Sequence, residues 1–329
     1  MENSKISRRD ALGLMAGAAA PLALGTKANA QNFPAREIKV VCAFPAGSGA
    51  DVLCRFYADG MKASFNQPII VENRVGGGGL LAQNYVARSK PDGHTVFIHA
   101  PSSTAANMSL YKNPGADVGK TLECLGAVSK LAFLVAVRAD APWKTLQDLV
   151  KHLQQKGDKG TYGITAPTGQ VAGALMCVNL GLKTLPVQYR TGPDSLNDLT
   201  SGNLDFAMYD PTFALAQVRG GRVRLLAIAS AERMQSMPDV PTMKEQGAGD
   251  INAIGWWGLL APVGLPGPVK KQLSDAFAAM ARSDRTKEFL AKLGTDSFIL
   301  TYPDSHKLFI AEIENWRGYI KRANIEPRG

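Results

Sequence analysis

The fold of this chain is decided by the segment Glu37-Ile-Lys-Val-Val-Cys-Ala-Phe44, which runs directly into Pro45-Ala-Gly-Ser-Gly-Ala50. The almost continuous apolar run from Val40 predicts a strand in a sheet that is covered on both faces. The glycine-rich turn ends this strand, and Asp51 opens a helix whose apolar residues recur at helical spacing. A strand, a turn and a helix in this order are the repeating unit of a parallel α/β sheet.

The same order of elements repeats along the rest of the chain. A strand at 68–72, a turn with glycines at 76–79 and a helix at 80–89 come next, and a third strand covers 95–99. After residues 122–138 the pattern restarts, with expected helices at 146–156 and 171–182 and expected strands at 162–165, 185–189, 206–209 and 223–229. We therefore predict an α/β protein with doubly wound sheets.

Two groups of strand–helix units, followed by a return of the chain, predict two lobes. The apolar segment 254–261 begins the return, and three expected helices end the chain at 268–281, 285–293 and 303–323. We predict that residues 31–130 and 254–329 form the first lobe and that residues 131–253 form the second. A chain that crosses twice between lobes makes a hinge, which suits the capture of a ligand by closure.

The first thirty residues have the pattern of an export signal. Ser7-Arg8-Arg9-Asp10 contains a twin-arginine pair, an apolar run covers 11–24, and Ala28-Asn29-Ala30 supplies small residues for a peptidase. The alternative is a membrane anchor, but the run is short and rich in Ala and Gly for a span of about 30 Å. We predict cleavage after Ala30, export by the twin-arginine route to the periplasm, and no membrane insertion of the remainder.

The charge and its distribution limit the partners. The formal net charge is +9, of which residues 1–30 contribute +2 and the remainder +7. The basic residues are scattered along the chain, whereas a nucleic-acid interface would gather them on one face or helix. We expect no nucleic-acid partner, and a mild positive field that favours encounter with anionic ligands.

The cysteines predict neither a metal site nor a redox motif. Cys42, Cys54, Cys124 and Cys177 show no CxxC pattern and no metal-ligand spacing. Cys42 lies in an expected core strand and Cys54 in the following helix, where a free buried thiol is the usual finding. A disulfide is the alternative, and we predict no metal and no cofactor.

Polar segments follow four of the expected strands, where ligands bind in open α/β sheets. In Phe44–Asp51 the glycines let backbone N–H groups approach an anion, and the next helix presents its positive end. Asp51 either contacts the ligand or only caps that helix. Ser102–Thr104 and Thr165–Gln170 offer hydroxyls and an amide, which bind oxygens without a formal charge.

The fourth segment is the single residue Asp210, which either caps a helix or accepts a hydrogen bond from the ligand. Single Ser and Thr residues near turns are often local caps, so two hydroxyl clusters at strand ends are better evidence than either alone. The predicted ligand-binding residues are Phe44, Ala46, Gly47, Ser48, Asp51, Ser102, Ser103, Thr104, Thr165, Ala166, Thr168, Gly169, Gln170 and Asp210.

Catalytic motifs are largely missing from the sequence. Gly115–Thr121 resembles a phosphate-binding loop but has one residue too few between its glycines. No GxSxG pattern surrounds Ser48, and the four histidines show no HExxH spacing. We predict that the protein is not an enzyme, with no catalytic residues; the alternative is a periplasmic serine-type hydrolase that uses Ser48 and His99.

Several segments together resemble one family. Phe44–Asp51 is similar to the FPPGGGxD loop of the Bug solute receptors, the TctC-like extracytoplasmic binding proteins of tripartite tricarboxylate transporters. Val71-Glu-Asn-Arg74 with the glycines at 76–79 is similar to the family's VENRPGAGG segment. The other segments that match in the family's order are 90–93, 201–206, 220–226, 237–242 and 256–262.

The resemblance implies a type II periplasmic-binding-protein fold, with two α/β lobes and a ligand cleft between them. It implies a periplasmic receptor that captures a small carboxylate by lobe closure and delivers it to a membrane permease; the alternative is a receptor for a signalling partner. Carried over by position, the contacts are Phe44–Asp51, Ser102–Thr104, Thr165–Gln170 and Asp210, and we expect a monomer. Ser48 replaces a usual glycine, and Arg190-Thr-Gly-Pro193 stands where YKGGAP is common.

Overall fold

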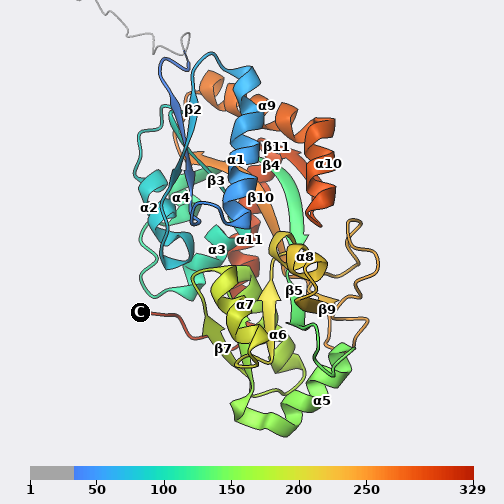
Figure 1. The fold of residues 1–329 in the computed structure, drawn as a ribbon. Coiled ribbons are helices and arrows are strands. Elements are labelled where there is room, and N and C mark those ends of the chain that lie inside the picture. Colours follow the sequence, from blue (N-terminus) through green and yellow to red (C-terminus); the bar gives the residue numbers. More distant parts are fainter. Residues whose placement is uncertain (1–32) are drawn as a thin grey trace, which may run out of the picture. The chain divides into compact units, whose positions relative to one another are not determined.

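Strand β1 (Ile38–Cys42), which the opening segment predicted, lies inside a six-stranded sheet in the computed structural model of the protein (Figure 1). It pairs in parallel with β2 (Ile69–Asn73) on one side and with β3 (Thr95–His99) on the other. The structure describes residues 33–329, so the predicted export signal at 1–30 lies outside the described residues.

The remaining strands of this sheet are antiparallel. β10 (Ile254–Pro262) pairs with β3 and with β4 (Leu122–Ala132), and β11 (Asp296–Thr301) pairs with β4. The strand order is β11-β4-β10-β3-β1-β2. The late segment at 254–262 thus returns to the sheet that the N-terminal strands began.

The second sheet has five strands in the order β7-β6-β8-β5-β9. β6 (Thr161–Ile164) is parallel to β7 (Leu185–Gln188) and to β8 (Phe206–Tyr209). β5 (Leu134–Arg138) is antiparallel to β8 and to β9 (Val223–Ile228). Both sheets therefore combine a parallel part, which the strand–helix alternation predicted, with antiparallel strands.

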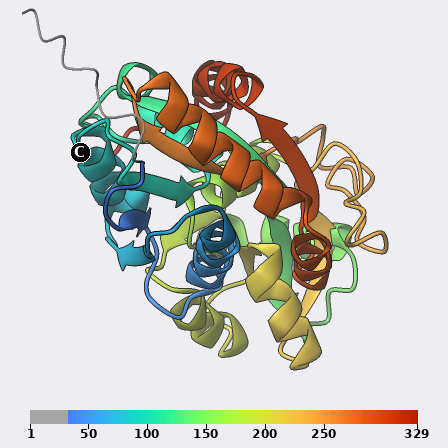
Figure 2. The same ribbon diagram turned by 90° about the horizontal axis from the view of Figure 1, so that it is seen from above.

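Helices connect the strands and cover the sheets (Figure 2). α9 packs against α1 and against β4, while α3 packs against β10 and α11. The α-helices are α1 (Gly49–Met61), α2 (Leu80–Ala87), α3 (Pro101–Leu110), α4 (Val118–Thr121), α5 (Leu146–Lys156), α6 (Pro167–Asn179), α7 (Gly192–Thr200), α8 (Pro211–Arg219), α9 (Gly267–Arg282), α10 (Asp284–Lys292) and α11 (Asp304–Arg322). Short 3₁₀ turns occupy Lys62–Ser64, Gly77–Gly79 and Gly157–Lys159.

The apolar core runs from one sheet to the other. A single cluster of buried side chains contains Val40 of β1 and also Met208 of β8. A smaller cluster lies under the second sheet and includes Leu134 and Tyr209. Residues 33–329 form one compact unit, and the division into two lobes at 130 and 253 stays a prediction.

The chain passes between the sheets twice. The first passage is a single residue, Phe133, between β4 and β5, and the second runs from the end of β9 to the start of β10. The two passages are hydrogen-bonded together, because Ala229 N donates to Phe133 O at 2.9 Å and Ala253 N donates to Ala229 O at 3.1 Å.

Several elements differ from the sequence prediction. α3 was not predicted, and α6 begins at Pro167 rather than at Val171. In both helices a proline occupies the first turn, where its fixed φ suits a helix and its missing N–H costs nothing. The segments at Ser102–Thr104 and Thr168–Gln170 are therefore first turns of helices and not loops. β11 was also missed, since its residues are mostly half-buried and give no strong apolar alternation.

The four cysteines are buried and unpaired within residues 33–329. Within residues 33–329, no helix combines the length and apolar character that a membrane span needs.

Candidate functional site

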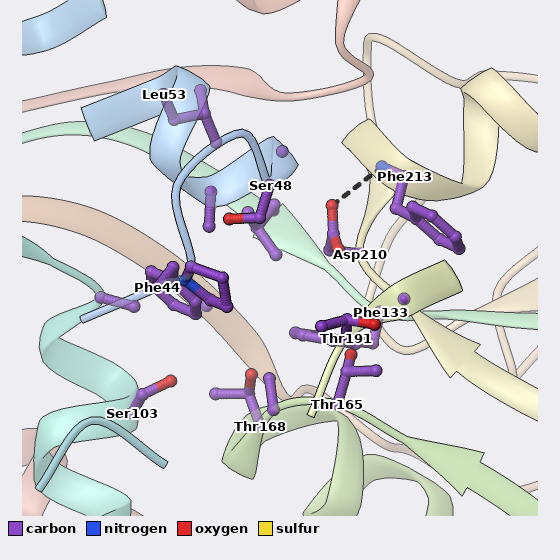
Figure 3. Close-up of a pocket in the computed structure, with 18 of the residues that line it drawn as sticks. Phe44, Ser48, Leu53, Ser103, Phe133, Thr165, Thr168, Thr191, Asp210 and Phe213 are labelled. Atoms are coloured by element: carbon purple, nitrogen blue, oxygen red, sulfur yellow. Dashed lines mark hydrogen bonds between the residues drawn. The ribbon is translucent and has the colours of Figure 1, made fainter. Parts of the chain in front are cut away.

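A cavity of about 230 Å³, called here the first cavity, lies where the ends of both sheets meet (Figure 3). One side of its lining follows β1 and β3 of the first sheet, and the other side follows β6 and β8 of the second. This is the position at which open α/β sheets bind ligands, beyond the carboxyl ends of their strands.

Five helices begin at the first cavity. The residues that line it include the N-terminal caps of α1, α3, α6, α7 and α8, namely Ser48, Ala100, Ala166, Thr191 and Asp210. A helix N-terminus carries about half a positive charge and N–H groups without an intrahelical acceptor. Five of them around one space make a strong field for an anion.

Two of these N-termini have unused donors. No side chain caps α3 or α6, so the first-turn N–H groups of Ser103 and Thr168 lack an acceptor within their helices. The hydroxyls of Ser103, Thr165 and Thr168 make no hydrogen bond within residues 33–329, and Figure 3 shows them around the same space. Together these groups present a set of donors to an oxygen of a ligand.

Two other hydroxyls at the cavity already cap helices. Ser48 Oγ accepts a hydrogen bond from Asp51 N at 3.2 Å, and Thr191 Oγ1 accepts one from Asp194 N at 3.3 Å. Thr191 also donates its proton to Asp194 at 2.6 Å, whereas the proton of Ser48 has no acceptor within the described residues. Ser48 can therefore hold its helix and donate to a ligand at the same time.

Asp210 is the acidic residue of the first cavity. Its Oδ1 accepts a hydrogen bond from Phe213 N at 3.0 Å, which caps α8 (Figure 3). Burial raises the pKa of Asp210, against the opposing effect of backbone hydrogen bonds from Phe213 and Thr212. Asp210 thus caps α8, which is one of the two roles that the sequence left open, and it also lines the cavity.

The rest of the wall is apolar. Phe44, Leu131, Phe133, Trp256 and Trp257 line the cavity and suit the carbon chain of a ligand. Within residues 33–329, no group of three or more His, Cys, Asp or Glu residues is placed to hold a metal ion.

Comparison with known proteins agrees with this geometry. The model of the tripartite tricarboxylate transporter family receptor matches residues 53–325. The chain belongs to this family. A protein encoded in the TAR-I ttuE-ttuC' intergenic region of Agrobacterium vitis is 30% identical over 80% of this chain and 77% of that protein.

Solved structures of other receptors match the fold closely. Rpa4515 of R. palustris with adipate has 26% identity and a TM-score of 0.84, over 90% of this chain and all of that one. The periplasmic binding protein BugD has 27% identity and a TM-score of 0.81, over 90% of this chain and all of that one. The predicted family and fold are therefore confirmed, and the relatives are binding receptors rather than enzymes.

Eight of the fourteen predicted site residues of this receptor line the first cavity. They are Phe44, Gly47, Ser48, Ser103, Thr165, Ala166, Thr168 and Asp210. Each of them lies between the end of a strand and the first turn of the following helix.

Asp51 faces away from the cavity. Its carboxylate is 2% exposed and accepts hydrogen bonds from Gly47 N at 2.9 Å, Arg55 Nε at 2.8 Å and Asn73 Nδ2 at 2.7 Å. It therefore ties the β1–α1 loop to α1 and β2, and this geometry supports the structural alternative rather than ligand contact.

The other five predicted residues do not line the cavity. Four of them make contacts with other parts of the structure, and the fifth is exposed. Ser102 Oγ accepts from Trp256 N at 3.4 Å, and Thr104 Oγ1 donates to Ala100 O at 3.3 Å. Gln170 Oε1 accepts from Arg328, and the Cα of Gly169 packs against the ring of Phe133. Ala46 is exposed to solvent and does not line the cavity.

Sequence reasoning missed the aromatic wall and one cation. Phe133, Phe213, Trp256 and Trp257 line the cavity, and so does Arg190, which forms no ion pair within residues 33–329. Arg190 lies in the segment 190–193, which stands where the family usually has YKGGAP. This departure from the family pattern was the one sequence signal that could have indicated Arg190 as a site residue. In the sequence, the aromatic residues look like ordinary core residues, and their spacing does not distinguish cavity residues from core residues.

Proposed function

We propose that this chain is a periplasmic receptor that holds a small organic acid in the first cavity. The observation that carries the proposal is the convergence of five helix N-termini on one space. Each N-terminus stabilises an anion by about 0.3–1 kcal/mol at an exposed site, and by more where water is partly excluded.

One carboxylate of the ligand fits against the uncapped N-termini of α3 and α6. There the N–H groups of Ser103 and Thr168 and the hydroxyls of Ser103, Thr165 and Thr168 supply donors without a formal charge. The carbon chain then lies against Phe44 and Trp257. A carboxylate bound mainly by dipoles keeps its charge without the desolvation of a buried cation.

The relatives support the remaining parts of the proposal. Rpa4515 is described with adipate, which favours an aliphatic acid as the ligand of this chain too. Membership of the transporter receptor family favours delivery to a membrane permease. The pattern at residues 1–30 favours export by the twin-arginine route, and we propose that the receptor acts as a monomer that closes on its ligand.

A panel of mono-, di- and tricarboxylates tests the proposal by thermal shift and calorimetry. A ligand at a hundred times its Kd stabilises the protein by about 2.7 kcal/mol. Ser103→Ala should weaken binding about five- to tenfold, the effect of one lost hydrogen bond. Ser109→Ala is the matched control, because Ser109 lies on the same helix outside the cavity.

Two results would contradict the proposal. One is the absence of any shift across the whole panel. The other is an equal loss of affinity in Ser103→Ala and Ser109→Ala, which would place the bound acid somewhere other than the N-terminus of α3.

A further inference from the structure

The backbone of Arg328 is anchored beside the first sheet. Arg328 N donates to Leu110 O at 2.9 Å and Lys112 N donates to Arg328 O at 2.7 Å, so residue 328 forms a parallel bridge with Tyr111 directly after α3. The guanidinium lies over the ring of Tyr111, with Cζ 5.3 Å from the ring centroid. Because α3 packs against β10, this anchor belongs to the part of the chain that carries the first sheet.

The side chain of Arg328 reaches the part of the chain that carries the second sheet. Nη1 donates to Oε1 of Gln188, the last residue of β7, at 3.3 Å, and Nη2 donates to Oε1 of Gln170 in the first turn of α6. Gln188 is exposed, whereas Gln170 is 8% exposed. A hydrogen bond from a charged donor is stronger where water is excluded, so Gln170 is the more important partner.

Two other side chains connect the two parts by hydrogen bonds within residues 33–329. Asp296 accepts from the backbone N–H groups of residues 235–236 at 3.0 and 2.9 Å, and these residues lie in the second passage between the sheets. Arg219 Nη2 donates to Lys292 O at 2.9 Å, where both residues are exposed. The bond from Arg328 therefore differs from both, because it joins two side chains away from the passages and one of them is buried. Figure 1 shows the C-terminal end and α10 on opposite sides of the molecule.

The residues of this bridge do not line the first cavity. Its lining contains none of Arg328, Gln170 and Gln188. A molecule in the first cavity is therefore held by other groups, and the bridge acts on the arrangement of the two sheets. A group that stabilises only the binding-competent arrangement raises the fraction of molecules in that arrangement, and it tightens the apparent affinity accordingly.

We propose that Arg328 and Gln170 form a latch that closes the receptor over its ligand, and that this latch sets how tightly and how long the ligand is retained without touching it. The inference rests on the proposed function, of which closure on a bound acid is a part. When the two sheets move apart, Arg328 stays with Tyr111 and Gln170 loses its charged donor. The latch therefore contributes equally to the retention of every acid that the closed receptor holds.

A double-mutant cycle tests the latch. Arg328→Ala, Gln170→Ala and the double variant are compared with the wild type by calorimetry, with adipate and with each other acid of the panel that the wild type binds. We expect each single variant to weaken binding about tenfold, the effect of one charge-assisted hydrogen bond, and by the same factor for each acid. The double variant should bind no more weakly than Arg328→Ala, because the same bond is lost in both.

The rate of dissociation separates the latch from a general loss of structure. Trp256 and Trp257 line the first cavity, so stopped-flow tryptophan fluorescence follows the release of the acid. Most of the tenfold loss should appear as faster release, while urea unfolding of the unliganded Arg328→Ala should change little, since the backbone bonds of residue 328 persist. Arg328→Lys should restore part of the affinity. If Arg328→Ala is unstable, Gln170→Ala tests the same bond from the other side.

Arg322→Ala is the matched control. Arg322 lies in the last turn of α11 with its Cζ 5.2 Å from the centroid of the Tyr319 ring, and it makes no hydrogen bond to the second sheet within residues 33–329. This variant removes an arginine from a similar aromatic contact near the same end of the chain. It should leave the affinity and the release rate unchanged.

The possible failures are distinguishable. Wild-type affinity in both single variants would overturn the latch and leave the proposed function standing. Losses that differ from acid to acid, or a double variant weakened by the product of the two single effects, would also overturn it, because the two side chains would then act on the ligand or independently of each other. A wild type that binds no acid would overturn the proposed function together with the latch.

Discussion

Replacing Gly169 with alanine tests the close contact between α6 and the wall of the first cavity. Gly169 lies in the first turn of α6, and a Cβ there would stand 2.7 Å from Phe133 Cδ1 and 2.9 Å from Cε1. Contacts this short do not occur between carbon atoms, so the ring must move. Phe133 is 4% exposed and belongs to the core, which leaves it little room to do so.

The size of the effect follows from two opposing contributions. Alanine in place of glycine favours a helix by about 1 kcal/mol. Inserting a methyl group into a packed core costs about 1–3 kcal/mol. We expect Gly169→Ala to lower the free energy of unfolding by about 0–2 kcal/mol, and to weaken ligand binding because the displaced ring lines the cavity.

Gly318 supplies the matched control. It is exposed on α11, and a Cβ there would meet no atom within 4 Å. Gly318→Ala should therefore stabilise the protein by about 0.5–1 kcal/mol, without a change in affinity. Urea unfolding measures the stability of both variants, and calorimetry measures binding. If Gly169→Ala proves as stable as Gly318→Ala and binds acids like the wild type, the packing of α6 on Phe133 is not as described.

Further predictions concern Asp210, which lines the first cavity, and Asp51, which holds the β1–α1 loop. In Asp210→Asn the amide keeps the cap of α8 but removes a negative charge from the first cavity, so strong acids should bind several-fold tighter at pH 7 by calorimetry. Because burial raises the pKa of Asp210, wild-type affinity for such acids should rise as the pH falls from 7 toward 5, while Asp210→Asn stays nearly flat; identical pH profiles would refute the charge effect. Asp51→Ala should cost about 1–3 kcal/mol of stability in urea unfolding, the cost of leaving buried donors unpaired. Although burial alone would raise it, hydrogen bonds from Arg55, Asn73 and Gly47 hold the pKa of Asp51 below its ordinary value. The stabilisation is therefore present above the unfolded pKa of about 3.9 and is lost as the pH falls through the folded value; a cost that does not change between pH 6 and pH 2 would contradict this origin.

Local patterns in the sequence were enough to predict the strand ends at the site. The run before Phe44 and the hydroxyls near residues 103 and 165 mark points where strands end and backbone donors are free, and these properties depend on neighbouring residues alone. Eight predicted residues line the cavity for this reason.

The direction of a side chain depends on tertiary partners and could not be predicted in this way. Asp51 has the sequence position of a ligand contact, but Arg55 and Asn73 turn it toward the interior. Trp257 belongs to β10, a strand of the first sheet that follows all strands of the second sheet along the chain. Its place at the cavity follows from long-range strand pairing, which no local periodicity encodes.

Phe133 connects the filling of the first cavity to the backbone segments that pass between the two sheets. It is the single residue between β4 and β5, its ring borders the first cavity, and its carbonyl oxygen accepts the hydrogen bond from Ala229, whose own oxygen accepts from Ala253. A bound molecule that displaces this ring therefore also displaces the two hydrogen-bonded segments by which the chain enters and leaves the second sheet. The amide protons of Ala229 and Ala253 should consequently exchange with solvent at rates that report whether the cavity is filled, although neither residue borders it.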